Sequence, residues 1–196
     1  MTEKELDIIG EIMNISMGAG ANALATLLMK TCYITTPDVQ ILHYDDLATL
    51  PSTDTMGVKI HYTKGVDGVN LFLLKKQDMS VIMGALMGME MEVFEFDEMT
   101  SSAACEIMNQ MMGSSATSLS QFFDTVVDIS TPEAFVLAER EGLSQYFETA
   151  KDEEIICVRF VLTIRDTLET DFMVYLNESI ARSLLDKVEK KTKIKF

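Results

Sequence analysis

The tetrapeptide EIMN occurs twice in this chain, 95 residues apart, and each copy holds a carboxylate and an amide that could act on one substrate. One copy supplies Glu11 and Asn14, and the other supplies Glu106 and Asn109. A carboxylate and an amide can orient a water molecule, and the amide can also hydrogen-bond a phosphoryl oxygen. Neither group carries the positive charge that neutralises a phosphoryl group. Such a pair would therefore work best inside a partner that already holds the phosphate and its metal.

Each pair belongs to a longer polar stripe on a predicted helix, because spacings of three and four residues return to the same helix face. The apolar residues Ile9, Ile12 and Met13 occupy another face, so we expect the stripe to face solvent. Each stripe contains a glycine, which costs a helix about 1 kcal/mol relative to alanine and is often retained where another backbone must approach closely. The stripes are Asp7, Glu11, Asn14 and Gly18 in the first half, and Ser102, Glu106, Asn109 and Gly113 in the second.

The repeat extends well beyond EIMN at the same offset of 95. Exposed glutamate and asparagine are ordinary on a helix, and a duplicated gene also keeps residues for packing. Two copies of the pair, each followed by a glycine one turn later, nevertheless favour a site that docks a partner. The further matches are Met17 with Met112, Gly18 with Gly113, Ala21 with Ala116, Leu24 with Leu119, Ile34 with Ile129, Thr36 with Thr131, and Pro37 with Pro132.

The same order of predicted elements occurs in each half: a long helix, a short extended piece, a hairpin and an amphipathic helix. We therefore predict one α/β (α+β) domain over residues 1–196, built from two internal repeats at about 1–95 and 96–196. Its sheet should be largely antiparallel, because hairpins connect the strands, and the two long motif helices should be related by a pseudo-two-fold axis.

Local signals place the ends of these elements. Thr2 with Glu5 can form a capping box for the first helix, and Thr100 or Ser101 is the expected N-cap of the second. The acidic stretch 92–100 leads into that second helix. The expected extended pieces are 32–42 and 126–137, the hairpin turns lie near 65–68 and 167–169, and the amphipathic helices cover 78–89 and 177–191.

Composition excludes several classes of function. The net charge of −15 would repel nucleic acid and anionic membrane surfaces. No apolar run is long enough to cross a membrane, and the acidic N-terminus lacks the features of a signal peptide. Three separated cysteines without a CxxC pair fit reduced thiols, and two histidines are too few for a typical zinc site. We expect a cytoplasmic protein that neither binds nucleic acid nor inserts into a membrane.

The sequence contains no GxSxG, Walker A or HExxH motif. Ser102 as a nucleophile would need a nearby base, and neither His43 nor His61 is placed by sequence to serve. The candidate chemistry therefore remains with the repeated glutamate and asparagine.

The two stripes resemble the motif of the CheC/CheX/FliY family of bacterial chemotaxis phosphatases. That motif is Asp or Ser, three residues, Glu, two residues, Asn, twenty-two residues and Pro. It fits twice without a gap, and the resemblance covers essentially the whole chain. Met13 and Met108 stand where a smaller residue is common, although both should face inward. The first copy is Asp7, Glu11, Asn14 and Pro37, and the second is Ser102, Glu106, Asn109 and Pro132.

The resemblance implies dephosphorylation of a phosphorylated CheY-like response regulator, with one site in each half. Glu11 and Glu106 would anchor the regulator, and Asn14 and Asn109 would hold water in line with its aspartyl phosphate. The remaining motif positions, Asp7, Ser102, Gly18, Gly113, Pro37 and Pro132, would support the sites. No cofactor of the chain's own is expected, since Mg²⁺ would belong to the bound regulator.

The resemblance also leaves alternatives open. The same surfaces could dock a regulator or a flagellar switch protein without catalysis, as FliM-like relatives of the fold do, or could bind a CheD-like deamidase. FliY proteins usually carry an N-terminal CheY-binding peptide and a C-terminal FliN-like domain, which this sequence lacks. We therefore expect either a stand-alone CheC-type protein or a fragment of a longer switch protein.

Overall fold

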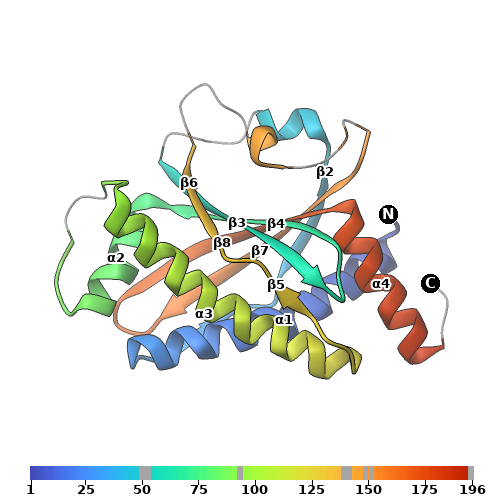
Figure 1. Ribbon diagram of the computed structural model, residues 1–196, viewed down its shortest axis with the longest axis horizontal. Coiled ribbons are helices and arrows are strands. Elements are labelled where there is room, and N and C mark those ends of the chain that lie inside the picture. The colour runs from blue at the N-terminus through green and yellow to red at the C-terminus, as the bar shows by residue number, and fades with distance from the viewer. Residues whose placement is uncertain (49–53, 92–94, 138–142, 148–149, 151, 194–196) are drawn as a thin grey trace.

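The structure is a computed structural model that describes the chain except residues 49–53, 92–94, 138–142, 148–149, 151 and 194–196. The described residues form a mixed α/β fold with an eight-stranded sheet (Figure 1). The helices are α1 (Glu3–Leu28), α2 (Lys76–Met87), α3 (Glu98–Phe123) and α4 (Glu178–Thr192), with 3-10 turns η1 (Tyr44–Ala48) and η2 (Leu143–Tyr146). The strands are β1 (Cys32–Ile34), β2 (Asp38–Leu42), β3 (Thr55–Lys64), β4 (Gly68–Lys75), β5 (Asp128–Ile129), β6 (Glu133–Val136), β7 (Ile155–Ile164) and β8 (Leu168–Asn177).

Every strand pairing in the sheet is antiparallel. The order is β1-β7-β8-β4-β3-β5, with β2 also pairing with β7 and β6 with β3. The hairpins β3–β4 and β7–β8 meet at the centre through the pairing of β4 with β8. The predicted fold class, with a largely antiparallel sheet and two long motif helices, is confirmed.

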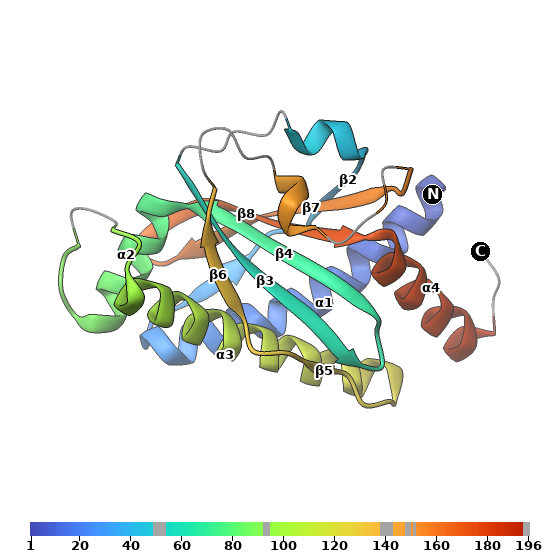
Figure 2. The same ribbon diagram turned by 45° about the horizontal axis from the view of Figure 1, so that its top comes forward.

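The edge strands of the two halves are exchanged. The extended piece of the first half, β1 and β2, pairs with β7 of the second half. The extended piece of the second half, β5 and β6, pairs with β3 of the first half, as Figure 2 shows for β6. Each central hairpin is therefore completed by strands from the other half of the chain.

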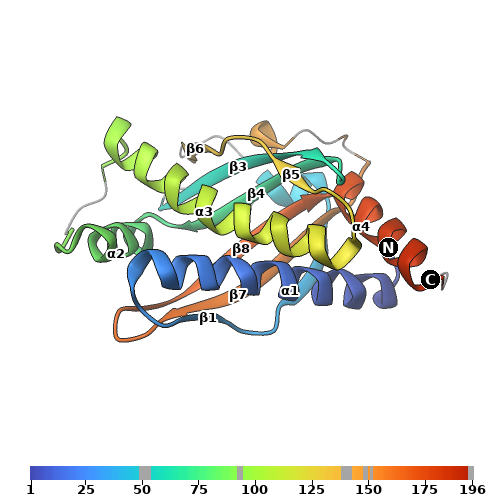
Figure 3. The ribbon, with the colours of Figure 1, turned by 60° about the horizontal axis from the view of Figure 1, so that its bottom comes forward.

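The two long helices lie side by side and antiparallel across one face of the sheet (Figure 3). The main hydrophobic core fills the space between them and the sheet, and includes Phe72, Val158 and Phe160. A second core on the opposite face lies beneath η1 and η2, where Leu71, Tyr175 and other side chains are buried. Neighbouring residues of β4 point into different cores, so the strand is buried on both faces and is apolar except for the buried Asn70 and the terminal Lys75.

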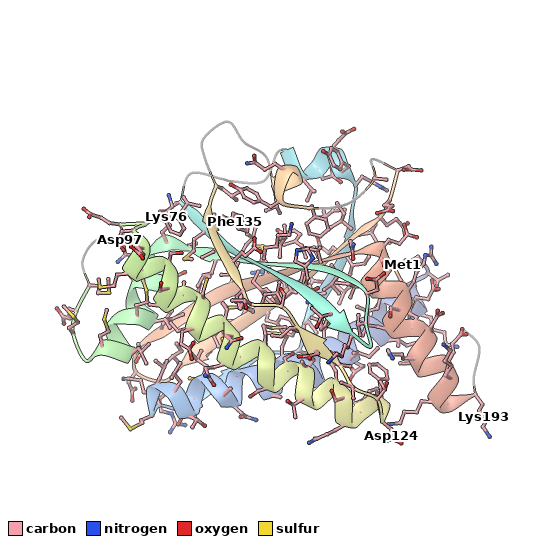
Figure 4. The ribbon with its side chains drawn as sticks, viewed as in Figure 1. Met1, Lys76, Asp97, Asp124, Phe135 and Lys193 are labelled. Carbon is pink, nitrogen blue, oxygen red and sulfur yellow. The ribbon has the colours of Figure 1, made fainter. Side chains whose placement is uncertain are left out.

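The structure corrects one predicted helix boundary. Asp97, not Thr100 or Ser101, is the N-cap of α3, and its carboxylate accepts a hydrogen bond of 2.8 Å from the Thr100 backbone N–H. The Asp97 backbone N–H donates a hydrogen bond to the Thr100 hydroxyl oxygen, which completes a capping box one turn earlier than expected. Figure 4 labels Asp97 and Asp124 at the two ends of the helix. The capping box of Thr2 and Glu5 on α1 is confirmed.

Smaller corrections concern the extended pieces and the second turn. Each extended piece is two strands, because Pro37 and Pro132 lie in the breaks between them and proline cannot donate to a strand ladder. The turn between β7 and β8 covers 165–167, slightly before the predicted position. Residues 92–94 of the predicted acidic stretch lie outside the described residues. Among the described helices, none is long and apolar enough to cross a membrane.

Candidate functional site

The first stripe lies along the outer face of α1. Asp7 and Glu11 are exposed, whereas Asn14 and Gly18 are half-buried. The inward face is buried because apolar residues recur there at helical spacing. The inward-facing apolar side chains, each no more than 2% exposed, include Ile9, Ile12, Met13, Met17, Ala21 and Leu24.

The second stripe occupies the corresponding face of α3. Ser102, Glu106 and Asn109 are exposed, and Gly113 is half-buried. Met108, like Met13 in the first copy, is only 1% exposed, so the prediction that both methionines face inward is confirmed. Both motif copies therefore present their polar residues outward from a helix whose other face is fixed in the core.

The glycines of the two stripes face open space. A Cβ atom built at Gly18 or at Gly113 would meet no heavy atom within 4 Å. Packing within the described residues therefore does not explain why glycine stands at these helical positions, where it costs about 1 kcal/mol relative to alanine. An open surface one turn beyond each asparagine leaves room for the backbone of a partner.

The two helices that carry the stripes contact each other closely. The buried hydroxyls of Ser16 and Ser115 are hydrogen-bonded to each other across the interface. A Cβ at Gly20 would lie 3.2 Å from the backbone carbonyl oxygen of Met111, so this glycine permits close approach of the helices. These contacts fix the positions of the two stripes relative to each other.

A shallow depression of about 440 Å³ lies between the C-terminal halves of the two helices. All of its lining residues are small or polar, and they form four pairs related by the offset of 95. The depression therefore lies on the pseudo-two-fold axis, between the two stripes. The pairs are Ala19 with Ser114, Asn22 with Thr117, Ala23 with Ser118, and Thr26 with Gln121.

A groove of about 500 Å³ runs beside the first stripe, between α1 and the segment that begins β2. Gly10 allows this segment to approach, since a Cβ there would lie 3.1 Å from a methyl carbon of Val39 and 3.9 Å from the ring of Pro37. Four carboxylates and several apolar side chains line the groove. Its lining is Glu3, Leu6, Asp7, Gly10, Glu11, Thr36, Pro37, Asp38 and Val39.

The second copy has a side chain where the first has Gly10, because Cys105 stands at the equivalent position. This thiol is half-buried beside the start of β6, near Glu133 and the Ala134 backbone. Burial raises the pKa of Cys105, the nearby Glu133 carboxylate adds to that effect, and a hydrogen bond with the Ala134 backbone opposes it. Pro132, the last residue of the second motif, is buried, whereas Pro37 is half-buried.

The two glutamates also have different neighbours. The Gln110 amide donates a hydrogen bond of 2.7 Å to a carboxylate oxygen of Glu106, one turn away on the same helix. The residue equivalent to Gln110 in the first copy is Ile15, which is 42% exposed. Within the described part of the chain, Glu11 has no hydrogen-bond or ion-pair partner.

The described residues do not favour a metal site or a cysteine nucleophile. No group of three or more His, Cys, Asp or Glu side chains within them is arranged to hold a metal ion. The cysteines Cys32, Cys105 and Cys157 are free thiols, and burial raises the pKa of each. A raised pKa lowers the thiolate fraction at neutral pH and makes these thiols poor nucleophiles.

Sequence reasoning identified the residues that the two copies share but missed those in which they differ. The structure places Gly10 and Cys105 beside the stripes, and Ile15 and Gln110 next to the glutamates. Position-by-position comparison of the two copies at offset 95 would have revealed both differences. What it could not reveal is the contact that each side chain makes.

The family model described as the CheC-like family matches residues 5–41 and 99–136, which contain the two motif copies. The chain is 33% identical over 189 residues to the flagellar motor switch phosphatase FliY of Bacillus subtilis, covering 94% of this chain and 49% of that protein. It therefore spans about half the length of that relative. It is 24% identical to the CheY-P phosphatase CheC of B. subtilis, over 87% of this chain and 93% of the relative.

The fold is also that of a solved relative. The crystal structure of Thermotoga maritima FliY superposes with a TM-score of 0.89 at 31% identity, and the match covers 97% of this chain and 98% of that one. The middle domain of FliM from Helicobacter pylori superposes with a TM-score of 0.73 at 14% identity, over 95% of this chain and 99% of that domain, which is a likeness of fold alone.

Proposed function

Because the chain belongs to the CheC-like family, we propose that it hydrolyses the phospho-aspartate of a CheY-like response regulator, with one site on α1 and one on α3. Relatives named as phosphatases, FliY and CheC, support this reaction class. The observation that carries the proposal is the duplicated pair of glutamate and asparagine on exposed helix faces. A surface that only docks a partner does not require that pair twice.

In the proposed mechanism the glutamate binds and the asparagine acts on the reacting water. Glu11 or Glu106 would form an ion pair with a cationic side chain of the regulator and so set the position of the helix. Asn14 or Asn109 would then enter the regulator's active site and hydrogen-bond a water molecule in line with the phosphorus. Holding the water in this geometry lowers the entropic part of the barrier.

The bonds that change lie in the regulator and the water. The water oxygen forms a bond to phosphorus as the bond from phosphorus to the aspartyl oxygen breaks, which regenerates the carboxylate and releases inorganic phosphate. The asparagine amide only orients the water, because an amide has no useful basicity at neutral pH. Mg²⁺ bound by the regulator would neutralise charge on the phosphoryl oxygens.

A long helix is a suitable carrier for such residues. The core-facing side of each motif helix is buried, and the contact between Ser16 and Ser115 ties the two helices together. A site on a rigid element holds its side chains more closely to the required geometry than a site on a loop. The open surface at Gly18 and Gly113 would let the regulator's backbone approach the asparagine.

Phosphate release from a phosphorylated CheY in the presence of Mg²⁺, measured under single-turnover conditions, tests the proposal. We expect the chain to release phosphate faster than the regulator does alone, and the variant Asn14→Ala with Asn109→Ala to lose that acceleration. Regulator that binds the chain but keeps its own rate of self-hydrolysis would contradict the enzyme and favour the non-catalytic docking module. Flagellar switch proteins and a CheD-like deamidase remain predicted partners from the resemblance.

A further inference from the structure

The two candidate sites share their glutamate and asparagine but differ in the side chain that flanks the glutamate. On an α-helix successive residues are rotated by about 100°, so positions 14 and 15 lie on opposite flanks of position 11. In the first copy Asn14 is therefore on one flank of Glu11 and Ile15 is on the other. In the second copy the same places hold Asn109 and Gln110.

The difference changes what Glu106 offers to a partner. Its carboxylate already accepts the 2.7 Å hydrogen bond from Gln110. A cation from a partner must either displace this amide or share the carboxylate with it. Glu11 has no such competitor among the described residues, and Ile15 beside it is 42% exposed.

An exposed isoleucine beside a carboxylate strengthens an ion pair in two ways. A partner that covers Ile15 gains the free energy of burying apolar surface. The same contact removes water from around the pair and lowers the local dielectric constant, which strengthens the attraction between the charges. A glutamine at this position gives neither effect, since its amide must exchange hydrogen bonds with water for hydrogen bonds with the partner.

The first site is also flanked by a groove. The groove of about 500 Å³ continues from Glu11 past Asp7 to Pro37 and Val39, on the flank away from Ile15. At the second site the thiol of Cys105 stands at the position equivalent to Gly10, which lines this groove. A partner side chain could thus enter beside Glu11 from the groove while its neighbours cover Ile15.

We propose that Ile15 and Gln110 are specificity-determining residues that make the two sites unequal, so that the response regulator binds the α1 site more tightly than the α3 site. The inference rests on the proposed function, because it assumes that a regulator docks on both stripes. It assigns the difference to one position of the motif helix, occupied by isoleucine in one copy and by glutamine in the other.

Single-site proteins and reciprocal substitutions test this assignment. Glu106→Gln with Asn109→Ala leaves only the α1 site, and Glu11→Gln with Asn14→Ala leaves only the α3 site. The probe is a CheY loaded with Mg²⁺ and beryllofluoride, and binding is measured by calorimetry. We expect the α1-only protein to bind about tenfold more tightly, which is the size of effect that follows from burying one apolar side chain in place of a polar one.

Exchanging the two side chains should reverse the order of the two affinities. Ile15→Gln in the α1-only protein should weaken binding about tenfold, and Gln110→Ile in the α3-only protein should strengthen it by a similar factor. Ile15→Leu is the matched control and should retain most of the affinity. The dissociation constant of the α3-only protein should rise more steeply with salt, because its ion pair is more exposed to solvent.

The outcomes separate this inference from the proposed function. If neither single-site protein binds the loaded regulator, the docking role of the stripes is wrong. If both bind with equal affinity, or if the exchange leaves their order unchanged, the stripes dock a regulator but Ile15 and Gln110 do not set the preference. An Ile15→Leu protein as weak as Ile15→Gln would likewise overturn the apolar contact.

Discussion

At the scale of single residues, the candidate sites consist of glutamate and asparagine side chains that catalyse nothing without a partner. A surface carboxylate and a surface amide have no unusual reactivity by themselves. The two asparagines differ in exposure, since Asn14 is half-buried and Asn109 is exposed. Asn14 therefore loses less side-chain freedom when a partner covers it.

The asparagine variants separate catalysis from binding. Asn14→Ala should lower single-turnover phosphate release at the α1 site by about a hundredfold, the usual effect of losing one group that acts in the transition state. Asn109→Ala should do the same at the α3 site. Affinity for the regulator should change much less, because the contact matters mainly in the transition state. A variant with normal turnover at the altered site would exclude the water-positioning role.

The glutamate variants give the complementary result. Glu11→Gln with Glu106→Gln should weaken regulator binding, because each change removes the charge that would pair with the regulator's cation. Thermal unfolding should be almost unaffected, since both side chains are exposed and such substitutions typically alter stability by less than about 0.5 kcal/mol. A large fall in melting temperature would instead identify the glutamates as structural residues.

The sequence predicted which helix faces carry the candidate residues but not the surroundings of those residues. The outward position of Glu11 and the inward position of Met13 follow from helical periodicity, which depends only on spacing. The hydrogen bond from Gln110 to Glu106 depends on side-chain rotamers, and the position of Cys105 depends on a strand distant in the sequence. Neither can be derived from the periodicity of one helix.

At the scale of elements, the close packing of α1 on α3 determines how the sites are held. The interface contains small residues, and its only polar side-chain contact among the described residues is between the hydroxyls of Ser16 and Ser115. The position of Gly20 against the Met111 carbonyl brings the helix backbones near each other. The sequence predicted both helices and associated the stripe glycines Gly18 and Gly113 with a partner, whereas Gly20, outside the stripes, serves this internal contact.

Removing one hydroxyl of this pair should destabilise the protein more than removing both. Ser16→Ala leaves the buried Ser115 hydroxyl without its partner, which should lower the free energy of unfolding by about 1–3 kcal/mol. The double variant with Ser115→Ala leaves no unsatisfied group and should recover part of that loss. Chemical denaturation of the four proteins in a double-mutant cycle measures the coupling, and strictly additive effects would contradict the buried hydrogen bond.

The N-terminal capping box predicts a dependence on pH. The backbone N–H of Thr2 donates a 2.6 Å hydrogen bond to the Glu5 carboxylate, and together with the Thr2 hydroxyl it lowers the pKa of Glu5 below its ordinary value of 4.5. Because the folded pKa is the lower one, this stabilisation is present above pH 4.5 and is lost as the pH falls through the folded pKa.

Thr2→Ala should therefore lower the free energy of unfolding by about 1 kcal/mol at neutral pH. The difference from the unaltered protein should shrink as the pH falls below 4.5 and through the lowered pKa of Glu5 in the folded state. Thermal melts from about pH 2 to about pH 7, which bracket the ordinary carboxyl pKa values of about 4, provide the measurement. A difference that stays constant over this range would mean that Glu5 takes no part in the cap.

At the scale of the whole molecule, the two repeats are interlocked. Pairing of β1 and β2 with β7, and of β5 and β6 with β3, gives each half its edge strands from the other. Repetition in the sequence predicts two similar units and a pseudo-two-fold axis. Repetition cannot predict this exchange, because the edge strands of each copy could pair equally well with the hairpin of their own copy or with that of the other.

A chain divided near the junction of the repeats tests the interlocking. Residues 1–91 and 95–196, produced separately, should each lack cooperative unfolding, because each hairpin would lack its edge strands and each helix its partner. Mixed in equal amounts, the two fragments should form a one-to-one complex with the circular dichroism of the intact chain. A fragment that folds alone would show that the repeats are independent domains and not one.

The exchanged edge strands also affect the order of events during synthesis. The ribosome completes β3 about 70 residues before it completes β6, which at roughly 5–20 residues per second is a delay of about 4–14 s. During this interval the backbone groups on the outer edge of β3 have no partner strand. Strands β1 and β2 remain unpaired for even longer, until β7 is made. An unpaired edge is a template for pairing with other chains. Until β5 and β6 are made, the edge of β3 in the nascent first half is therefore a site at which this chain is prone to aggregation.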